Sequence, residues 1–223
     1  MTHFVLVHGV AHGAWCWGQT RADLVVLGHG VTAVDLALTS LDDDAAIVMN
    51  TLDEIDGPVV LVGHSYGGHV ISKAAHERAD VAHLVYVAAM LLGGDEVFTD
   101  VSVAFAPSQL GDALVIAEDG RFTVDPKAAT GCFYNECTPE TAIDAVAQLR
   151  ATSLGCVTVP SGAEPWRGIP STYVVCDRDN AIHPEMQRMM AQHAAHTVAI
   201  DTDHSPFMST PAELLVILVA AAP

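Results

Sequence analysis

The sequence has few positive charges. Only 9 of its 223 residues are Lys or Arg, against 27 Asp and Glu, which gives a formal net charge of −18. A surface of this sign repels the phosphate backbone of nucleic acids and the anionic headgroups of membranes. We therefore expect neither a nucleic acid nor a membrane among its partners, and we assign the charge to solubility.

Long hydrophobic runs are also missing. Although 51% of the residues are hydrophobic, no uninterrupted apolar stretch reaches the ~18 residues that a membrane span requires. Residues 1–8 lack the positive charge and the small-residue cleavage site of a signal peptide, and they are typical of a first β-strand. These features predict a cytoplasmic protein.

Cysteines are few, and their spacing fits neither a disulfide framework nor a zinc site. Their number is odd, and no two of them have the CxxC spacing. We expect reduced, mostly buried thiols. The sequence shows no metal-ligand cluster and no phosphate-binding glycine loop, so we expect no metal and no cofactor. The cysteines are Cys16, Cys132, Cys137, Cys156 and Cys176.

The chain does contain a regular alternation of strand-like and helix-like segments. It extends over residues 1–90 and returns over residues 169–223, and these two regions form the expected core. The alternation predicts the α/β class, with a mostly parallel sheet covered by helices on both faces. Strands are expected at residues 4–7, 31–35, 59–62, 82–89, 171–176 and 197–200, and helices at 17–27, 42–55, 69–78, 184–194 and 211–221.

Residues 91–168 interrupt the alternation. Residues 91–127 have no clear period, residues 132–150 are helix-like, and residues 153–170 are irregular and rich in Gly and Pro. A segment of this length is not a plain loop. We interpret residues 91–168 as a cap or lid insertion that lies over the active edge of the sheet.

The most informative stretch is residues 59–68, Val-Val-Leu-Val-Gly-His-Ser-Tyr-Gly-Gly. Four apolar residues are typical of a buried parallel strand, and a helix-compatible run follows the glycines. Between them lies a Gly-x-Ser-x-Gly turn, the pattern of a nucleophile elbow. In so tight a turn, side chains at Gly63 and Gly67 would collide with neighbouring backbone. Ser65 is then held clear of the sheet at a helix N-terminus, where partial positive charge favours a developing anion.

A nucleophilic serine needs a general base and an acid that orients this base. Functional groups of a parallel sheet gather past the carboxyl ends of the strands, and two further strand ends carry suitable residues. His204 lies in a short polar turn after the last strand and is the expected base. Asp177 and Asp179 compete for the role of the acid, and Asp179 is favoured because it lies deeper in its loop. The chain order Ser, Asp, His is the one stated for such an elbow.

The oxyanion of an acyl-transfer reaction needs two backbone donors. The N–H of Tyr66, directly after the serine, is the first. The N–H of Val10, in the loop after the first strand, is the natural second. Gly9 and Gly13 allow this loop to approach closely.

Four residues near these loops are candidates for the substrate pocket: His8, Gly9, Trp15 and His64. The two histidines also have structural interpretations. His8 ends the first strand and can shape the adjacent loop through hydrogen bonds. His64 precedes Ser65 in the elbow, so alternation directs it away from the serine hydroxyl and favours a packing role.

A combination of motifs extends over nearly the whole chain, at residues 3–9 with 12–15, 59–68, 174–179 with 184–187, and 203–204. Together they resemble one group of α/β-hydrolases, which holds plant methyl-ester esterases, plant α-hydroxynitrile lyases and bacterial esterase relatives. The resemblance implies the α/β-hydrolase fold, with Ser65 as nucleophile, His204 as base and Asp179 as acid. It places the oxyanion donors at Val10 and Tyr66. The implied activity is hydrolysis of small-molecule carboxylic esters through an acyl-enzyme.

The same group contains lyases that cleave cyanohydrins. The resembling plant lyases carry a threonine after the first-strand histidine and a lysine after the catalytic histidine, where this chain has Gly9 and Ser205. His64 before the serine is as in the esterases. The resemblance therefore favours an esterase, with cyanohydrin cleavage and a non-enzymatic small-molecule receptor as alternatives. The small and apolar residues of the insertion indicate a modest apolar acyl or alcohol group.

Overall fold

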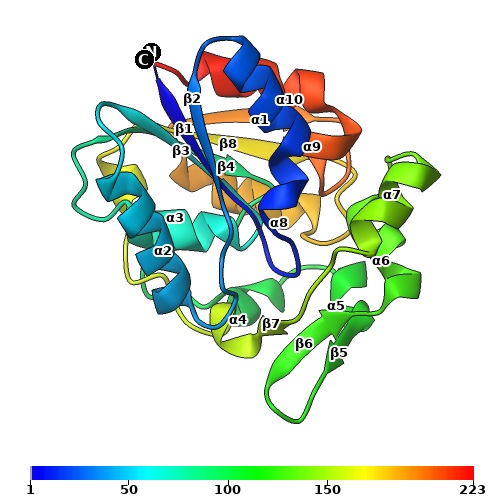
Figure 1. Ribbon diagram of the computed structural model, residues 1–223. Coiled ribbons are helices and arrows are strands. Elements are labelled where there is room, and N and C mark those ends of the chain that lie inside the picture. Colours follow the sequence, from blue (N-terminus) through cyan, green and yellow to red (C-terminus); the bar gives the residue numbers. More distant parts are fainter. Residues whose placement is uncertain (1) are drawn as a thin grey trace.

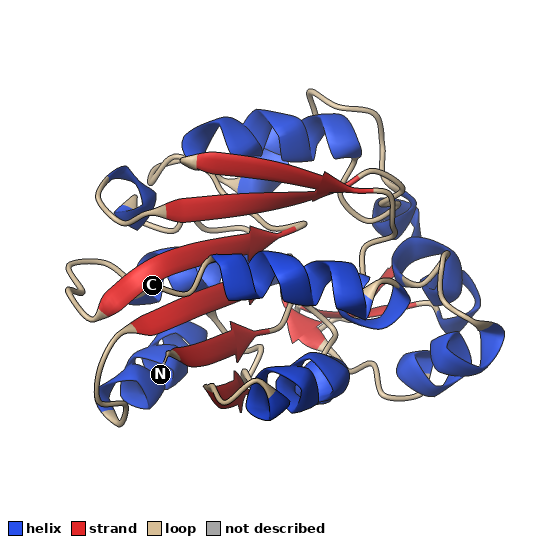
Figure 2. Cartoon of the chain, turned by 90° about the horizontal axis from the view of Figure 1, so that it is seen from above, coloured by secondary structure: helices blue, strands red, loops and turns tan. Residues whose placement is uncertain are grey.

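The main sheet of the computed structural model, which describes residues 2–223, has six parallel strands. Their order is β2-β1-β3-β4-β8-β9, and the predicted α/β fold class is confirmed. All six arrows point toward the same end of the sheet (Figure 2). The strands are β1 (His3–Val7), β2 (Gly30–Val34), β3 (Val59–His64), β4 (Val81–Val87), β8 (Ser171–Cys176) and β9 (His196–Ile200).

Helices cover both faces of this sheet (Figure 1). Successive strand residues face opposite sides, so Val5 and Leu61 belong to one apolar core and Phe4 and Val60 to the other. No helix within residues 2–223 has the length and apolar character needed to cross a membrane. The first core is covered by α2 (Leu41–Asp53), α3 (Gly67–Ala74) and α8 (Pro184–Met190), and the second by α1 (Gly18–Val26), α9 (Pro206–Ser209) and α10 (Pro211–Ala220).

The strand order reverses at β1. From β1 the chain moves outward to β2, and it then returns to place β3 on the other side of β1. The loops that follow β1 and β3 therefore leave the sheet in opposite directions and open a crevice at its carboxyl end, which is where open α/β sheets bind ligands. Ser65 follows β3 directly, so the fold places it at this crevice.

Most of residues 91–168, called the insertion below, lies beyond the carboxyl end of the sheet (Figures 1 and 2), and its last part returns beside α3 to the start of β8. They contain a second, antiparallel sheet of β5 (Leu114–Ile116), β6 (Arg121–Val124) and β7 (Thr152–Ser153). Its helices are α4 (Phe98–Ser102), α5 (Gln109–Ala113), α6 (Pro126–Phe133) and α7 (Pro139–Val146). The short 3-10 helices of the chain are Ala14–Trp17, Leu154–Cys156, Pro165–Arg167 and Ala191–His193.

The insertion differs from its prediction in two ways. The aperiodic stretch 91–127 contains most of a small sheet, whose strands of three and four residues are too short for a strand prediction from their pattern. Of the helix-like stretch 132–150, only residues 139–146 form a helix of their own, α7, because residues 132–133 end α6 and residues 134–138 separate the two helices. The second begins where Thr138 accepts a hydrogen bond from the Thr141 N–H and Pro139 takes the first helical position.

The elbow between β3 and α3 has the strained backbone that its motif implies. Ser65 has a φ of 53°, in the left-handed region that non-glycine residues avoid. A Cβ at Gly63 would lie 2.5 Å from the Gly67 carbonyl oxygen, and one at Gly67 would lie 2.6 Å from the Val7 carbonyl oxygen. Both neighbours are backbone atoms that cannot rotate away, so this turn requires glycine at both positions.

His69, on the helix that follows the elbow, is buried without a partner. Its side chain is 2% exposed, and within residues 2–223 neither ring nitrogen makes a hydrogen bond. Burial disfavours the charged ring and lowers its pKa from 6.5 to about 4. The unfolded chain, with the higher pKa, therefore binds the proton more tightly than the folded protein does.

The free energy of unfolding is accordingly expected to fall as the pH drops through the interval from 6.5 to about 4. His69 alone should remove about 2 kcal/mol of it between about pH 8 and about pH 5. The measurement is urea unfolding at both pH values for the native chain, for His69→Leu and for His76→Leu, which replaces an exposed histidine. The loss should shrink only in His69→Leu, and an equal loss in all three proteins would contradict the assignment.

Candidate active site

Three side chains singled out in the sequence come from three loops at the carboxyl end of the sheet. Ser65 follows β3, Asp179 follows β8 and His204 follows β9. All three are buried, and Ser65, at 4% exposure, lines the main cavity. His204 Nδ1 lies 2.6 Å from Asp179 Oδ2. Because an ionised carboxylate can only accept, Nδ1 carries the proton and Nε2 of the neutral ring keeps its lone pair.

The structure distinguishes the two aspartates that the sequence left in competition. Asp177 lies at the protein surface, where it accepts a hydrogen bond from Arg188 Nη2 at 2.6 Å. Asp179 is buried and is the one that meets His204.

The Asp179 carboxylate accepts four hydrogen bonds. Oδ1 accepts from the Ala181 and Ile182 N–H groups at 2.7 and 2.9 Å. Oδ2 accepts from Gln187 Nε2 at 2.7 Å, in addition to the bond from His204. The loop backbone and the following helix α8 therefore hold the carboxylate in one orientation.

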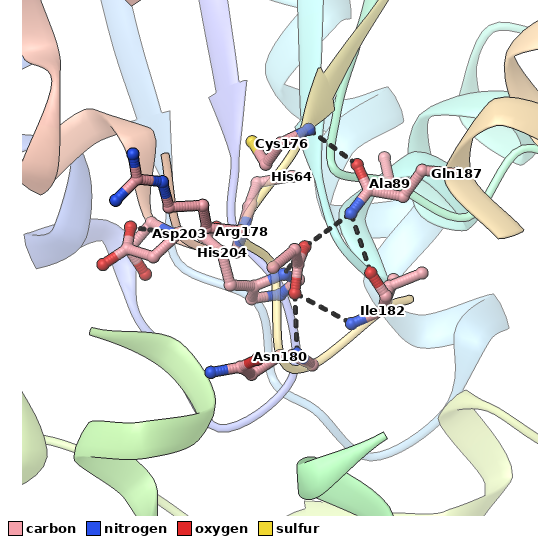
Figure 3. Close-up of polar contacts among 12 residues, drawn as sticks. His64, Ala89, Cys176, Arg178, Asn180, Ile182, Gln187, Asp203 and His204 are labelled. Atoms are coloured by element: carbon pink, nitrogen blue, oxygen red, sulfur yellow. Dashed lines mark hydrogen bonds and ion pairs between the residues drawn. The ribbon is translucent and has the colours of Figure 1, made fainter. Parts of the chain in front are cut away.

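The sequence indicated no function for Gln187, although this residue lies in one of the motifs shared with the esterases, at residues 184–187. Its side chain extends between Cys176 and Ile182 (Figure 3). Oε1 accepts from the Cys176 N–H at 2.9 Å, and Nε2 donates to the Ile182 carbonyl at 2.8 Å as well as to Asp179. The fully buried amide thus uses both of its donors and its acceptor, which fixes its orientation.

The serine hydroxyl is less constrained than its backbone. The Ser65 N–H donates to the Val87 carbonyl at 3.1 Å, and the Ser65 carbonyl accepts from the Met90 N–H at 2.9 Å. Within residues 2–223, Ser65 Oγ makes no hydrogen bond, and the bonds of the His204 ring run to Asp179 alone. Contacts between nucleophile and base commonly tighten only when substrate is bound.

The loop after β1 lies directly against the serine. A Cβ at Gly9 would lie 2.7 Å from Ser65 Cβ and 3.2 Å from Ser65 Oγ. In the part of the chain that the structure describes, the N–H groups of Val10 and Tyr66 donate to no protein acceptor. Two backbone donors are therefore free on the two segments that flank the serine.

His64 faces His204. The two ring centroids are 4.6 Å apart, and His64 Nε2 lies 2.8 Å from the His204 carbonyl oxygen, to which it donates. Burial, reinforced by the positive forms of His204 and His12, lowers the pKa of His64 well below 6.5. His64 is therefore a neutral packing residue that fixes the backbone of His204.

The cavity that Ser65 lines has a volume of about 410 Å³. Its walls are mostly apolar, and among the described residues 2–223 the only ionisable ones in the lining are Asp112 and His183. Within residues 2–223, no group of three or more His, Cys, Asp or Glu side chains is arranged to hold a metal ion. The insertion supplies much of the wall through Phe98, Phe105, Leu110, Leu114, Phe122 and Val157.

The four residues expected in the substrate pocket, His8, Gly9, Trp15 and His64, do not line this cavity. His8 is buried at the end of β1, where its Nε2 accepts from the Leu36 N–H at 3.0 Å. Trp15 lies beside a separate surface groove. The sequence motifs lie at the strand ends, whereas much of the cavity wall comes from the insertion, which carries no such motif.

Comparisons with known proteins identify relatives of this chain. The chain is 29% identical to methylesterase 2 from Arabidopsis thaliana, covering 99% of this chain and 95% of that protein. It is 28% identical to methyl jasmonate esterase 1 from Vitis vinifera, covering 95% and 93%. The crystal structure of polyneuridine aldehyde esterase superimposes with a TM-score of 0.83 at 22% identity, covering 99% and 98%. Residues 4–216 match the alpha/beta hydrolase family. The resemblance seen in the sequence is thereby confirmed, and the chain belongs to the alpha/beta hydrolase family.

Proposed function

We propose that this protein hydrolyses carboxylic esters, with Ser65 as nucleophile, His204 as general base and Asp179 as the acid that orients the base. The observation that carries the proposal is the buried contact of 2.6 Å between His204 and Asp179, at the same end of the sheet as a serine that lines a cavity. The relatives named methylesterase and methyl jasmonate esterase support the same reaction class.

The proposed reaction uses each group in turn. Nε2 of His204 accepts the Ser65 proton as Oγ attacks the ester carbonyl, and Asp179 stabilises the imidazolium that forms. The N–H groups of Val10 and Tyr66 donate to the oxyanion of the tetrahedral intermediate. The alcohol leaves with the proton from His204, and water then cleaves the acyl-enzyme with the same base.

We also propose that the insertion acts as the cap of a core formed by residues 1–90 and 169–223. Its position beyond the carboxyl end of the sheet and its share of the cavity wall support this role. The cap then determines which substrates reach Ser65, whereas the core supplies the proposed triad.

Two positions support ester hydrolysis over cyanohydrin cleavage. At Gly9 even a single Cβ would overlap Ser65 Cβ, so the threonine of the resembling lyases has no room here. Where these lyases carry a lysine, this chain has Ser205, a fully buried uncharged residue. The site therefore lacks the positive charge that would stabilise a departing cyanide.

The cavity favours neutral, apolar esters. It is lined by no Lys or Arg, and an acidic residue, Asp112, belongs to its wall. The net charge of −18 adds long-range repulsion of anions. An anionic acyl group would lose its hydration in this cavity without gaining a positive partner.

Replacing the nucleophile tests the reaction. Ser65→Ala should lower kcat for p-nitrophenyl butyrate by roughly 10³-fold or more, with an unchanged melting temperature as evidence of folding. Substantial activity in the folded variant would exclude Ser65 as the nucleophile. A native chain without turnover would favour the receptor alternative, and cyanide release from mandelonitrile would favour the lyase.

The two aspartates provide a matched pair for the acid. Asp179→Asn should lower kcat by roughly 10³- to 10⁴-fold, because the amide cannot hold the imidazole in the required tautomer. Asp177→Asn removes only a surface ion pair and should leave kcat within about threefold. Steady-state kinetics of the two variants decide the assignment, which is wrong if Asp177→Asn shows the larger loss.

The effect of substrate charge on kcat/KM can be tested with two esters of nearly the same shape. p-Nitrophenyl hemisuccinate differs from p-nitrophenyl butyrate by a carboxylate in place of the terminal methyl group, and its kcat/KM should be roughly 100-fold lower. Going from acetate to butyrate should raise kcat/KM about tenfold, since each buried methylene contributes ~0.8 kcal/mol. Equal values for butyrate and hemisuccinate would contradict the charge argument.

A further inference from the structure

We propose that Thr152 of the insertion is a positioning residue that holds the loop after β1, residues 9–13, in the conformation required for catalysis. The inference rests on the proposed function, because it concerns the Val10 N–H as an oxyanion donor. The Thr152 hydroxyl accepts a hydrogen bond from the Ala11 N–H at 2.9 Å, across 141 positions of sequence. Both residues are fully buried.

Ala11 needs such support because its backbone is strained. Its φ of 60° lies in the left-handed region, which an alanine adopts only when its surroundings enforce it. The insertion bonds the backbone of Ala11 on both sides. The Ala11 N–H donates to Thr152, and the Ala11 carbonyl accepts from the Arg150 N–H at 2.9 Å.

The next residue of the loop is held by the insertion as well. Arg150 Nε donates to the His12 carbonyl at 2.7 Å, and the Tyr134 hydroxyl donates to His12 Nε2 at 2.8 Å. His12 Nδ1 in turn donates to the Val10 carbonyl at 2.8 Å. Burial lowers the pKa of His12 to about 3, so the ring is neutral and has one donor and one acceptor to satisfy.

These contacts leave the Val10 N–H as a free donor beside the serine. In the described part of the chain it has no protein acceptor, whereas the Val10 carbonyl accepts from His12 Nδ1 and the next N–H, that of Ala11, donates to Thr152. Val10 lines the cavity together with Ser65. If the backbone of Ala11 took another conformation, the Val10 N–H would therefore move relative to the oxyanion.

The strand that holds the loop pairs with a strand of the cavity wall. Thr152 in β7 pairs with Phe122 in β6, and Phe122 lines the cavity. The ribbon of β6 and β7 therefore connects the site of substrate contact with the proposed oxyanion donor.

Thr152 offers a sharp test, because valine has nearly the same shape without the acceptor. Thr152→Val should lower kcat for p-nitrophenyl butyrate by roughly 10- to 100-fold, less than the full removal of an oxyanion donor, while KM changes by less than about threefold. Thr152→Ser keeps the hydroxyl and should retain kcat within about threefold. A merely structural role would not produce this division between kcat and KM together with rescue by serine.

A transition-state analogue provides a second measurement. A trifluoromethyl ketone forms a tetrahedral adduct with the serine, whereas the matching trifluoromethyl carbinol cannot. In Thr152→Val the affinity for the ketone should fall by the same factor as kcat/KM, and the affinity for the carbinol should stay within about threefold of the native value.

The control is Thr158→Val, which changes a threonine of the same insertion whose hydroxyl donates only to the nearby Leu154 carbonyl. It should leave both kcat and ketone affinity unchanged. If Thr152→Val does not fold, as judged by its melting transition, Thr152→Ala takes its place with the same expectation.

Native kcat in Thr152→Val, or equal losses in the valine and serine variants, would overturn the inference while the proposed function stands. Activity that persists in Ser65→Ala would instead overturn the proposed function, and the role of Thr152 with it.

Discussion

The close approach of two backbone segments at Ser65 is the constraint on which the rest of the site depends. The elbow turn packs Gly67 against the carbonyl of Val7, and the loop after β1 brings Gly9 against the serine side chain. Side chains at these positions would separate the segments, and the two free N–H groups would no longer flank one hydroxyl. The strain at Ser65 and at Ala11 is the cost of this arrangement, and the surrounding hydrogen bonds offset it.

Around Ser65 these bonds run to Val87 and Met90 of the core, whereas around Ala11 they come from the insertion, which also contacts the loops that carry the proposed acid and base. Beside the acid, Asn180 donates to the Gly131 carbonyl at 2.9 Å. Beside the base, Asp203 accepts from the Glu136 N–H at 2.9 Å. The loop after β1 is held through Thr152 and Arg150. The insertion is thus part of the scaffold of the site as well as the wall of its cavity.

The core of the fold and the three polar groups of the site could be predicted because their signals are local. Ser65, Asp179 and His204 each follow an apolar strand, and parallel strands bring such positions to one edge of the sheet. Gln187 and Thr152 have no local signal, because each acts on a residue that only the folded chain brings near. The small sheet of the insertion could not be predicted either, because its strands of three and four residues are too short to give a clear pattern.

Two paired residues of the insertion, Phe122 and Thr152, differ in how freely they can be replaced when substrate preference changes. Residues of the insertion that line the cavity, such as Phe122, can vary in size without touching the proposed triad. Thr152, its pairing partner, cannot vary as freely, because its hydroxyl satisfies the buried N–H of a strained residue. A buried N–H left without an acceptor costs about 1–3 kcal/mol. Within one ribbon, a position open to adaptation and a position fixed by the catalytic geometry therefore lie side by side.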